Sequence, residues 1–192
     1  MTLQRALLII GVLCLGIYIV FTVQAHLYQE KLEDSFETMV RQPVSPTEAG
    51  NREYREGDLV GRLEIPRLQL SVMVLEGIQS RTLRLGAGHI PGTPLPGTGS
   101  NAGIAAHRDT FFRPLAEIRP NDHIQVQTLG KTVSYRVVET KIVQPEDVSV
   151  LKATGKESIT LVTCYPFYYV GPAPQRFIVR AQADSENETT RR

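Results

Sequence analysis

The chain has 192 residues, of which 42% are hydrophobic and 21% charged, so it can build one domain around a packed core and wholesale disorder is excluded. Its 21 basic and 20 acidic side chains nearly cancel, so the composition gives no basic patch and we expect no nucleic-acid partner. Two cysteines exclude a disulfide scaffold and cannot form a thiolate zinc site unaided.

The amino-terminal stretch Ala6–Val23 is uncharged and strongly apolar. Because a bilayer-spanning helix needs roughly 17–20 such residues, the stretch predicts a transmembrane signal-anchor within residues 1–27. Arg5 and the free amino group favour a cytoplasmic amino terminus, with the rest of the chain outside the cell membrane. A cleaved signal peptide is the alternative, since Val23-Gln24-Ala25 resembles a cleavage site, although the run exceeds the usual core of about 7–15 residues. Either way, the domain is exported.

Residues 28–57 read as a stalk helix followed by a linker. Apolar residues at helical spacing in Tyr28–Val40 predict a continuation of the first helix, which either lays a weak stripe on the domain or forms a solvated stalk. Prolines, glycines and charges then mark a linker. We expect the folded domain at 58–183 and a flexible polar tail at 184–192.

The domain itself reads as short strands joined by loops. A short helix is expected to start with Ser80 as its cap, and a helical turn near Phe111 and Leu115. The stretch 86–103 is too rich in glycine and proline to be regular. Many short strands at this spacing predict a mostly β fold with a closed or nearly closed sheet. The expected strands are 63–65, 68–74, 104–106, 124–126, 132–143, 159–164 and 176–182.

Cys164 is the first candidate for chemistry, because it ends a strand directly before Tyr165-Pro166. Cys14 lies inside the apolar stretch, so a membrane separates the two thiols and they cannot pair. A strand end holds a side chain rigidly where it can be reached from outside, and a nearby cation would raise the thiolate fraction. An inert, buried cysteine is the alternative interpretation.

Histidines and arginines are the groups that could activate this thiol. His107 follows small strand residues and precedes a turn, whereas His89 lies in a glycine-rich segment where its ring could satisfy backbone carbonyls. His123 sits in a turn and is expected to face solvent. Arg176 opens the last strand, and its guanidinium comes near the sulfur if that strand pairs with the one bearing Cys164; otherwise it is a surface arginine.

Three segments of the chain resemble the sortase family. LVTCYP (161–166) resembles its Thr-Cys strand end, AAHRDTFF (105–112) its histidine segment, and QRFIVRA (175–181) its arginine strand. The stretches GRLEIPRLQL and GAGHIPGTPLPG are similar to class D and E-like members. The resemblance covers the whole exported domain with the motifs in the family's order.

The resemblance implies an eight-stranded sortase-type β-barrel with short helices, preceded by the transmembrane helix. It also implies a cysteine transpeptidase in which Cys164 is the nucleophile, His107 the acid/base and Arg176 the charged stabiliser. Such an enzyme cleaves an LPxTG-like sorting signal of a surface protein, forms a thioacyl intermediate, and transfers the acyl group to an amine. The amine belongs to a cell-wall precursor or a pilin lysine.

Substrate-binding residues follow from the same resemblance. Thr163 is expected to assist through its hydroxyl, and Ala105, Val148 and Leu151 to line the groove for the sorting signal. Burial of Val148 and Leu151 in the barrel is the alternative. Histidines and carboxylates lack metal-ligand spacing, so no metal and no cofactor are expected.

Two other functions remain open at this stage. One is a different Cys–His enzyme of the cell envelope, an L,D-transpeptidase or a cysteine protease, which would use similar thiol chemistry in other motifs. The other is a non-catalytic barrel that binds a surface partner, with Cys164 as inert packing.

Overall fold

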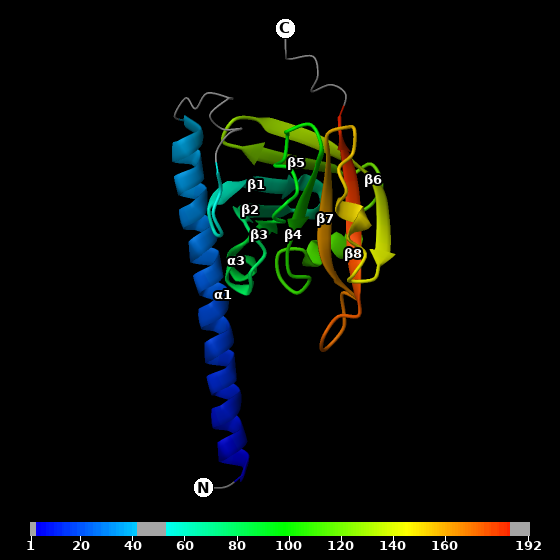
Figure 1. Ribbon diagram of the computed structural model, residues 1–192. Coiled ribbons are helices and arrows are strands. Elements are labelled where there is room, and N and C mark those ends of the chain that lie inside the picture. Colours follow the sequence, from blue (N-terminus) through cyan, green and yellow to red (C-terminus); the bar gives the residue numbers. More distant parts are fainter. Residues whose placement is uncertain (1–2, 42–52, 185–192) are drawn as a thin grey trace.

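The expected short strands close into a barrel in the computed structural model, which describes residues 3–41 and 53–184 (Figure 1). The barrel order is β1-β2-β3-β4-β7-β8-β6-β5, which confirms the predicted eight-stranded architecture. The elements, with η for 3₁₀-helices, are α1 (Leu3–Arg41), β1 (Leu59–Ile65), η1 (Pro66–Leu68), β2 (Leu70–Glu76), α3 (Ser80–Leu85), β3 (Ala87–His89), β4 (Asn101–Ala105), η2 (Arg113–Glu117), β5 (His123–Thr128), β6 (Thr132–Val143), η3 (Val148–Leu151), β7 (Ser158–Tyr165) and β8 (Gln175–Ala183).

Alternating side chains of these strands fill the barrel interior. Most neighbouring strands are antiparallel, whereas β2 pairs with β3 and β4 pairs with β7 in parallel. Because successive side chains of a strand point to opposite faces, each strand sends every second residue inward. The interior side chains include Leu63, Ile104, Val126, Tyr135 and Leu161, all fully buried.

The stretch 86–103 is more regular than its composition suggests, so the prediction of an irregular segment was wrong in part. It contains all of β3 and the first residues of β4. The central residue of β3 is Gly88, and a Cβ there would overlap the carbonyl oxygen of Gly77. Glycine is thus required by a close backbone approach inside a strand. The predicted cap was also wrong, because α3 begins at Ser80 but Gln79 is its N-cap, without a side-chain hydrogen bond.

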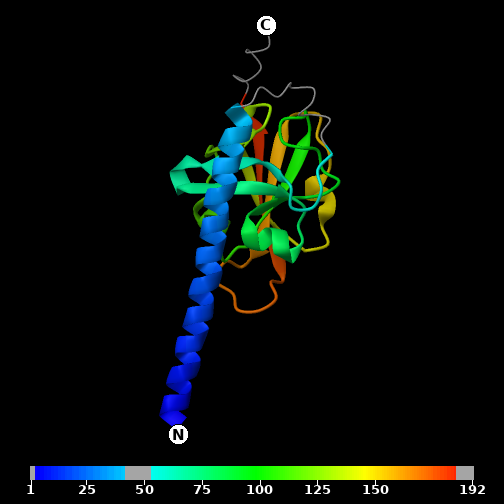
Figure 2. The same cartoon turned by 90° about the vertical axis from the view of Figure 1, so that its left-hand side faces the viewer.

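Helix α1 is continuous from the apolar stretch to Arg41 and packs along the barrel (Figure 2). Phe36 is buried against Met73 and Leu129, so the expectation of a stripe on the domain holds rather than a solvated stalk. Polar contacts add to this packing: Gln29 accepts from the Met73 backbone N–H at 2.9 Å and donates to a backbone carbonyl of α3. Glu33 accepts from Arg62 Nη1 at 2.8 Å.

The amino-terminal part of α1 is exposed and apolar. The helix is long and apolar enough to cross a membrane. Most of the predicted linker, residues 42–52, and the tail residues 185–192 lie outside the described residues. The boundaries 1–27, 28–57, 58–183 and 184–192 therefore stay predictions.

An ion pair between Arg67 and Asp122 connects η1 to the turn that precedes β5. Arg67 Nη2 donates to Asp122 Oδ2 at 2.6 Å, and the Arg119 backbone N–H donates to the same oxygen at 2.7 Å. The hydrogen bond from Arg67 is the main cause that holds the pKa of Asp122 below the usual carboxyl value. Since the folded-state pKa is lowered, the pair stabilises the fold at neutral pH, and this contribution is lost as pH falls through the carboxyl range.

We therefore expect Asp122→Asn to unfold at lower urea concentration than the wild type at pH 7, and the difference to shrink as pH approaches 3. Urea unfolding of the full chain in detergent at pH 7, 5 and 3 measures both effects. Glu37→Gln, which removes an exposed ion pair with Arg41, is the control and should leave the profile unchanged. Equal profiles for the Asp122→Asn variant and the wild type would contradict the assigned role.

Candidate active site

The residues of the candidate site lie on the outer face of three neighbouring strands, β4, β7 and β8. Ile104, Leu161 and Val179, one from each strand, are fully buried in the core. By strand alternation, the residues between them face outward. In the register Ala105 is opposite Val162, so outward residues of β4 meet outward residues of β7.

Cys164 is on this outer face, at the last-but-one position of β7. Its neighbour Thr163 is only 2% exposed and lies on the core side, and the two point to opposite faces. The thiol is free and half-buried. A half-buried thiol at the end of a strand is both held in place and reachable from solvent.

His107 comes two residues after the end of β4 and continues its alternation. The parallel ladder extends past the strand, because the Ala106 backbone N–H donates to Val162 O at 3.2 Å. Ala105 is paired with Val162, and two residues further along each strand are His107 and Cys164. The parallel register therefore places His107 beside Cys164. The imidazole is exposed, whereas the backbone is fixed by a turn in which the Phe112 N–H donates to His107 O at 3.1 Å.

Arg176 is paired directly with Cys164 across the antiparallel β7–β8 ladder. Residues opposite each other in such a ladder share one face, with Cα atoms about 4.5–5.5 Å apart. Its Nη1 donates to Ala173 O at 3.2 Å and to Gln175 O at 2.9 Å, which orients the guanidinium at the start of β8. A guanidinium has five N–H donors, so these bonds leave donors for another acceptor.

The three candidates thus come together on one face at one end of the barrel, from positions far apart in the sequence. Within residues 3–41 and 53–184, no hydrogen bond or ion pair joins the thiol, the imidazole and the guanidinium to one another. Catalytic side chains are often loosely aligned without substrate and tighten when it binds. Adjacent strands can therefore bring a nucleophile, a proton carrier and a cation to one acyl group.

Thr163 is the predicted site residue that the structure does not bring to this face. Its hydroxyl points to the core side and donates to Ala106 O at 2.8 Å. This bond ties the chain that precedes His107 to the strand that carries Cys164. Thr163 is therefore a positioning residue in this arrangement, and its hydroxyl is not on the face that a substrate would contact.

Thr163→Val keeps the side-chain volume but removes the hydroxyl, so the carbonyl of Ala106 loses its buried donor. We expect the fold to lose about 1–3 kcal/mol, and the rate of the acyl transfer expected from the sequence to fall by up to about 10²-fold, because His107 is no longer held against β7. Chemical unfolding and kcat measurements give the two values. Thr163→Ser, which retains the hydroxyl, should recover most of the rate. If the serine variant is as slow as the valine variant, the hydrogen bond is not the cause.

The other predicted substrate-binding residues surround the outer face. Ala105 is half-buried on β4. It is paired with Val162, which lies two residues before Cys164 on β7. The Cδ2 of Leu151 would lie 3.0 Å from a Cβ on Gly103, so Leu151 covers the outer face there and is not buried in the barrel. Val148 is 67% exposed, at the start of η3.

Helix η3 is fixed over this face by one carbonyl. Val150 O accepts from Asn101 Nδ2 at 3.1 Å, from Thr160 Oγ1 at 3.3 Å and from Arg180 Nη2 at 3.3 Å. All three donors belong to the outer face of the same strands. The η3 segment therefore covers the end of the face that is remote from Cys164.

Sequence reasoning missed Arg108, which is only 6% exposed. It donates to Pro166 O at 2.8 Å and to Tyr169 O at 2.7 Å, and so links the segment after His107 to the β7–β8 loop after Cys164. Apart from the adjacent Asp109, whose Oδ2 lies 3.5 Å from Nε, its partners are backbone carbonyls about sixty positions away in the chain. Every residue has a backbone carbonyl, so the sequence does not show which carbonyls an arginine will bind. Only the position of Arg108 next to His107 could have drawn attention to it.

The remaining histidine candidates are held elsewhere. His89 is buried at the end of β3. Its Nε2 lies 3.0 Å from Pro94 O, as expected for a ring that satisfies a backbone carbonyl, whereas its Nδ1 lies 2.7 Å from the carboxylate oxygen Glu76 Oε2. His123 is exposed, as expected, but it is the first residue of β5 and not part of a turn, and its Nδ1 lies 3.4 Å from Asp184 Oδ2. In the part of the chain that the structure describes, no group of three or more His, Cys, Asp or Glu could hold a metal ion.

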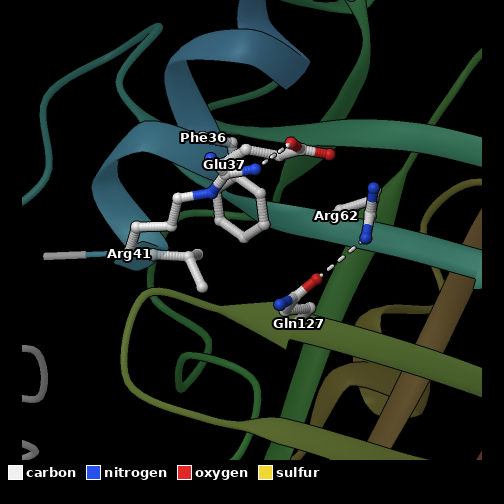
Figure 3. Close-up of a pocket in the computed structure, with 6 residues that line it drawn as sticks. Phe36, Glu37, Arg41, Arg62 and Gln127 are labelled. Atoms are coloured by element: carbon white, nitrogen blue, oxygen red, sulfur yellow. Dashed lines mark hydrogen bonds and ion pairs between the residues drawn. The ribbon is translucent and has the colours of Figure 1, made fainter.

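A hollow of about 280 Å³ lies between the end of α1 and the barrel, away from these candidates (Figure 3). Arg62 crosses it from β1 and donates to Gln127 Oε1 at 3.0 Å. Its walls are polar and apolar in about equal parts, and none of the candidate site residues lines it. The lining residues are Phe36, Glu37, Val40, Arg41, Arg62 and Gln127. It is the space left where the helix leaves the barrel surface.

Comparison with known proteins agrees with this barrel. The sortase domain model matches residues 63–184, which is more than half of the chain. The chain belongs to the sortase family. Sortase D of Bacillus subtilis is 36% identical over 124 residues, covering 64% of this chain and 63% of that protein. Sortase A of Listeria monocytogenes is 29% identical over 133 residues, covering 67% of this chain and 60% of that protein. The chain thus spans less than two thirds of these curated relatives, and it is similar to class D.

Solved sortase structures share the fold. A sortase D5 transpeptidase of Clostridium perfringens superposes with a TM-score of 0.69 at 24% identity, covering 83% of this chain and 98% of that one. Sortase C1 of Streptococcus suis gives a TM-score of 0.63 at 27% identity, covering 67% and 74%. The sortase-type barrel expected from the motifs is therefore confirmed.

Proposed function

We propose that this chain is a membrane-anchored cysteine transpeptidase that cleaves an LPxTG-like sorting signal and transfers the acyl part to an amine. Membership of the sortase family supports the reaction class. The observation that carries the assignment of residues is the strand register around Cys164, which pairs it with Arg176 and sets His107 beside it on the same face. Cys164, His107 and Arg176 are accordingly the proposed catalytic residues.

The first half of the reaction forms a thioester. The sulfur of the Cys164 thiolate attacks the carbonyl carbon of the scissile peptide, and the carbonyl oxygen becomes an oxyanion. Arg176 has N–H donors to spare for this oxygen or for the substrate backbone, and a cation stabilises charge as it develops. Protonated His107 gives its proton to the leaving amine, the C–N bond breaks, and the acyl group stays on sulfur.

The second half reverses these roles. An incoming amine attacks the thioester carbon, His107 accepts its proton, and the C–S bond breaks to release the new amide and the Cys164 thiolate. The exposed imidazole on a fixed backbone suits both proton transfers, because the ring can turn between leaving and entering groups. We propose a cell-wall precursor or a pilin lysine as the source of the amine, and exported proteins with a sorting signal as the acyl donors.

The anchor is the apolar part of α1. We propose that it crosses the cell membrane once, with the amino terminus in the cytoplasm and the barrel outside. Its length, its exposed apolar surface and the position of Arg5 before the apolar stretch support this topology.

A peptide library with an added amine tests the proposal. The full chain in detergent should ligate the amine to peptides with an LPxTG-like motif, and hydroxylamine should capture the thioacyl intermediate as a hydroxamate. Mass spectrometry identifies both products. A cysteine protease would give only the hydrolysed acid when the amine is present, and a binding protein would give no product at all. Either result would refute the transpeptidase assignment.

A further inference from the structure

The β7–β8 loop carries a run of exposed apolar and aromatic side chains. Tyr168 is 82% exposed, Tyr169 is nearly half exposed and Val170 is fully exposed. Three consecutive exposed side chains with apolar surface at the tip of a loop suit contact with a partner or a membrane. The side chains of a membrane–water interface have this character, because a tyrosine ring places its body in the apolar layer and its hydroxyl at the headgroups.

Two arginines of the segment after His107 contact this loop. Arg108 fixes the loop's backbone through Pro166 O and Tyr169 O, and it lies 5.8 Å from the centroid of the Tyr169 ring. Arg113 lies over the ring of Tyr168, 4.7 Å from its centroid. About half of the Arg113 side chain is exposed, and its Nη1 lies 4.0 Å from Asp109 Oδ1, so this cation already has an acidic neighbour.

The packing of α1 sets the height of this loop relative to a bilayer. Gln29 is hydrogen-bonded to Met73 N and to a carbonyl at the end of α3, so the barrel touches the helix from this position on. The apolar stretch ends at Val23, six residues earlier. At 1.5 Å per residue, the near end of the barrel is about 9 Å from the end of that stretch.

The loop extends past this end of the barrel. In both views the β7–β8 loop projects beyond α3, on the side of the molecule toward which the apolar half of α1 runs (Figures 1 and 2). The interfacial region on one side of a bilayer is about 5–8 Å deep, so α3 lies just outside it. A loop that reaches further than α3 toward the bilayer is placed to meet this region.

We propose that the tip of the β7–β8 loop, Tyr168–Val170, contacts the headgroup–acyl boundary of the membrane that α1 crosses. The inference rests on the proposed anchor. It gives the exposed tip an occupant, the surface of the bilayer that the exposed apolar part of α1 would cross. It also places the mouth of the active site, which this loop borders directly after Cys164, at the membrane surface.

Tryptophan fluorescence gives a direct test, because the chain has no tryptophan of its own. Tyr168→Trp places a single indole at the tip. In vesicles that contain only the full chain and phospholipid, its emission should shift to the blue and should be strongly quenched by lipids brominated near the headgroup end of the acyl chain. The matched control is Gln182→Trp, an exposed position six residues along β8 from Arg176, which should be quenched several-fold less.

Three outcomes are distinguishable. If the indole at 168 is quenched no more than the indole at 182 while the chain floats with the vesicles, the loop contact is refuted and the anchor stands. If the chain does not float, the anchor and the contact fall together. Val170→Asp, added to Tyr168→Trp, should reduce the quenching, and unchanged quenching would contradict insertion of the tip. None of these readouts depends on acyl transfer, which is measured separately with the soluble peptide and amine.

Discussion

Cys164→Ala is expected to abolish acyl transfer, lowering the rate by a factor on the order of 10³ or more, because no other group can form the thioester. The barrel should remain folded. The thiol is half-buried on the outer face rather than in the core, so its loss should cost about 1 kcal/mol or less. Hydroxamate formation and amide formation measure the two halves of the reaction, and circular dichroism monitors the fold.

The chain contains a matched control for this experiment. Cys14 is the other free cysteine, exposed on the apolar part of α1, and Cys14→Ala should leave both products unchanged. The pair of variants separates a general effect of thiol removal from loss of the nucleophile. Turnover by the Cys164→Ala variant would refute the nucleophile assignment, even if the family membership stands.

Arg176→Lys should reduce kcat by about 10²–10³-fold. A lysine keeps the positive charge, but its single ammonium cannot hold the carbonyls of Ala173 and Gln175 and at the same time present a planar pair of donors to a substrate oxygen. KM for the peptide should change less than kcat if Arg176 acts mainly on the charge that develops during attack.

The comparison for Arg176 is another arginine replaced in the same way. Arg136 lies on β6 in an exposed ion pair with Asp184, and Arg136→Lys should leave kcat near the wild-type value. If the Arg176→Lys rate is also near the wild-type value, Arg176 is a surface residue and the oxyanion needs another donor.

Much of the barrel could be predicted because alternation of apolar residues is a local signal. β6 and the main part of β7 follow directly from it. The parallel pairings β2–β3 and β4–β7 could not be predicted, because they join segments through long connections that local sequence does not specify. β3 has three residues around a glycine, which is too short for a period to be recognised.

The candidate site shows the same division. Cys164 and Arg176 come together through one antiparallel ladder, which the short loop between them made predictable. The inward position of Thr163 could have been found, because Ile159 and Leu161 share its face, but Val162 is apolar as well and blurs the alternation. Arg108 could not be found, because its partners are backbone carbonyls.

The closed barrel also limits how a peptide can be recognised. Every strand of the described barrel has a hydrogen-bonded neighbour on both sides, so the sheet has no open edge. An extended peptide cannot join β4, β7 and β8 as one more strand, in the way that sheet-edge binders capture their ligands. The barrel must therefore distinguish one peptide from another through side-chain and loop contacts across this face. Such contacts select for particular peptide side chains, whereas strand addition would accept any extended backbone.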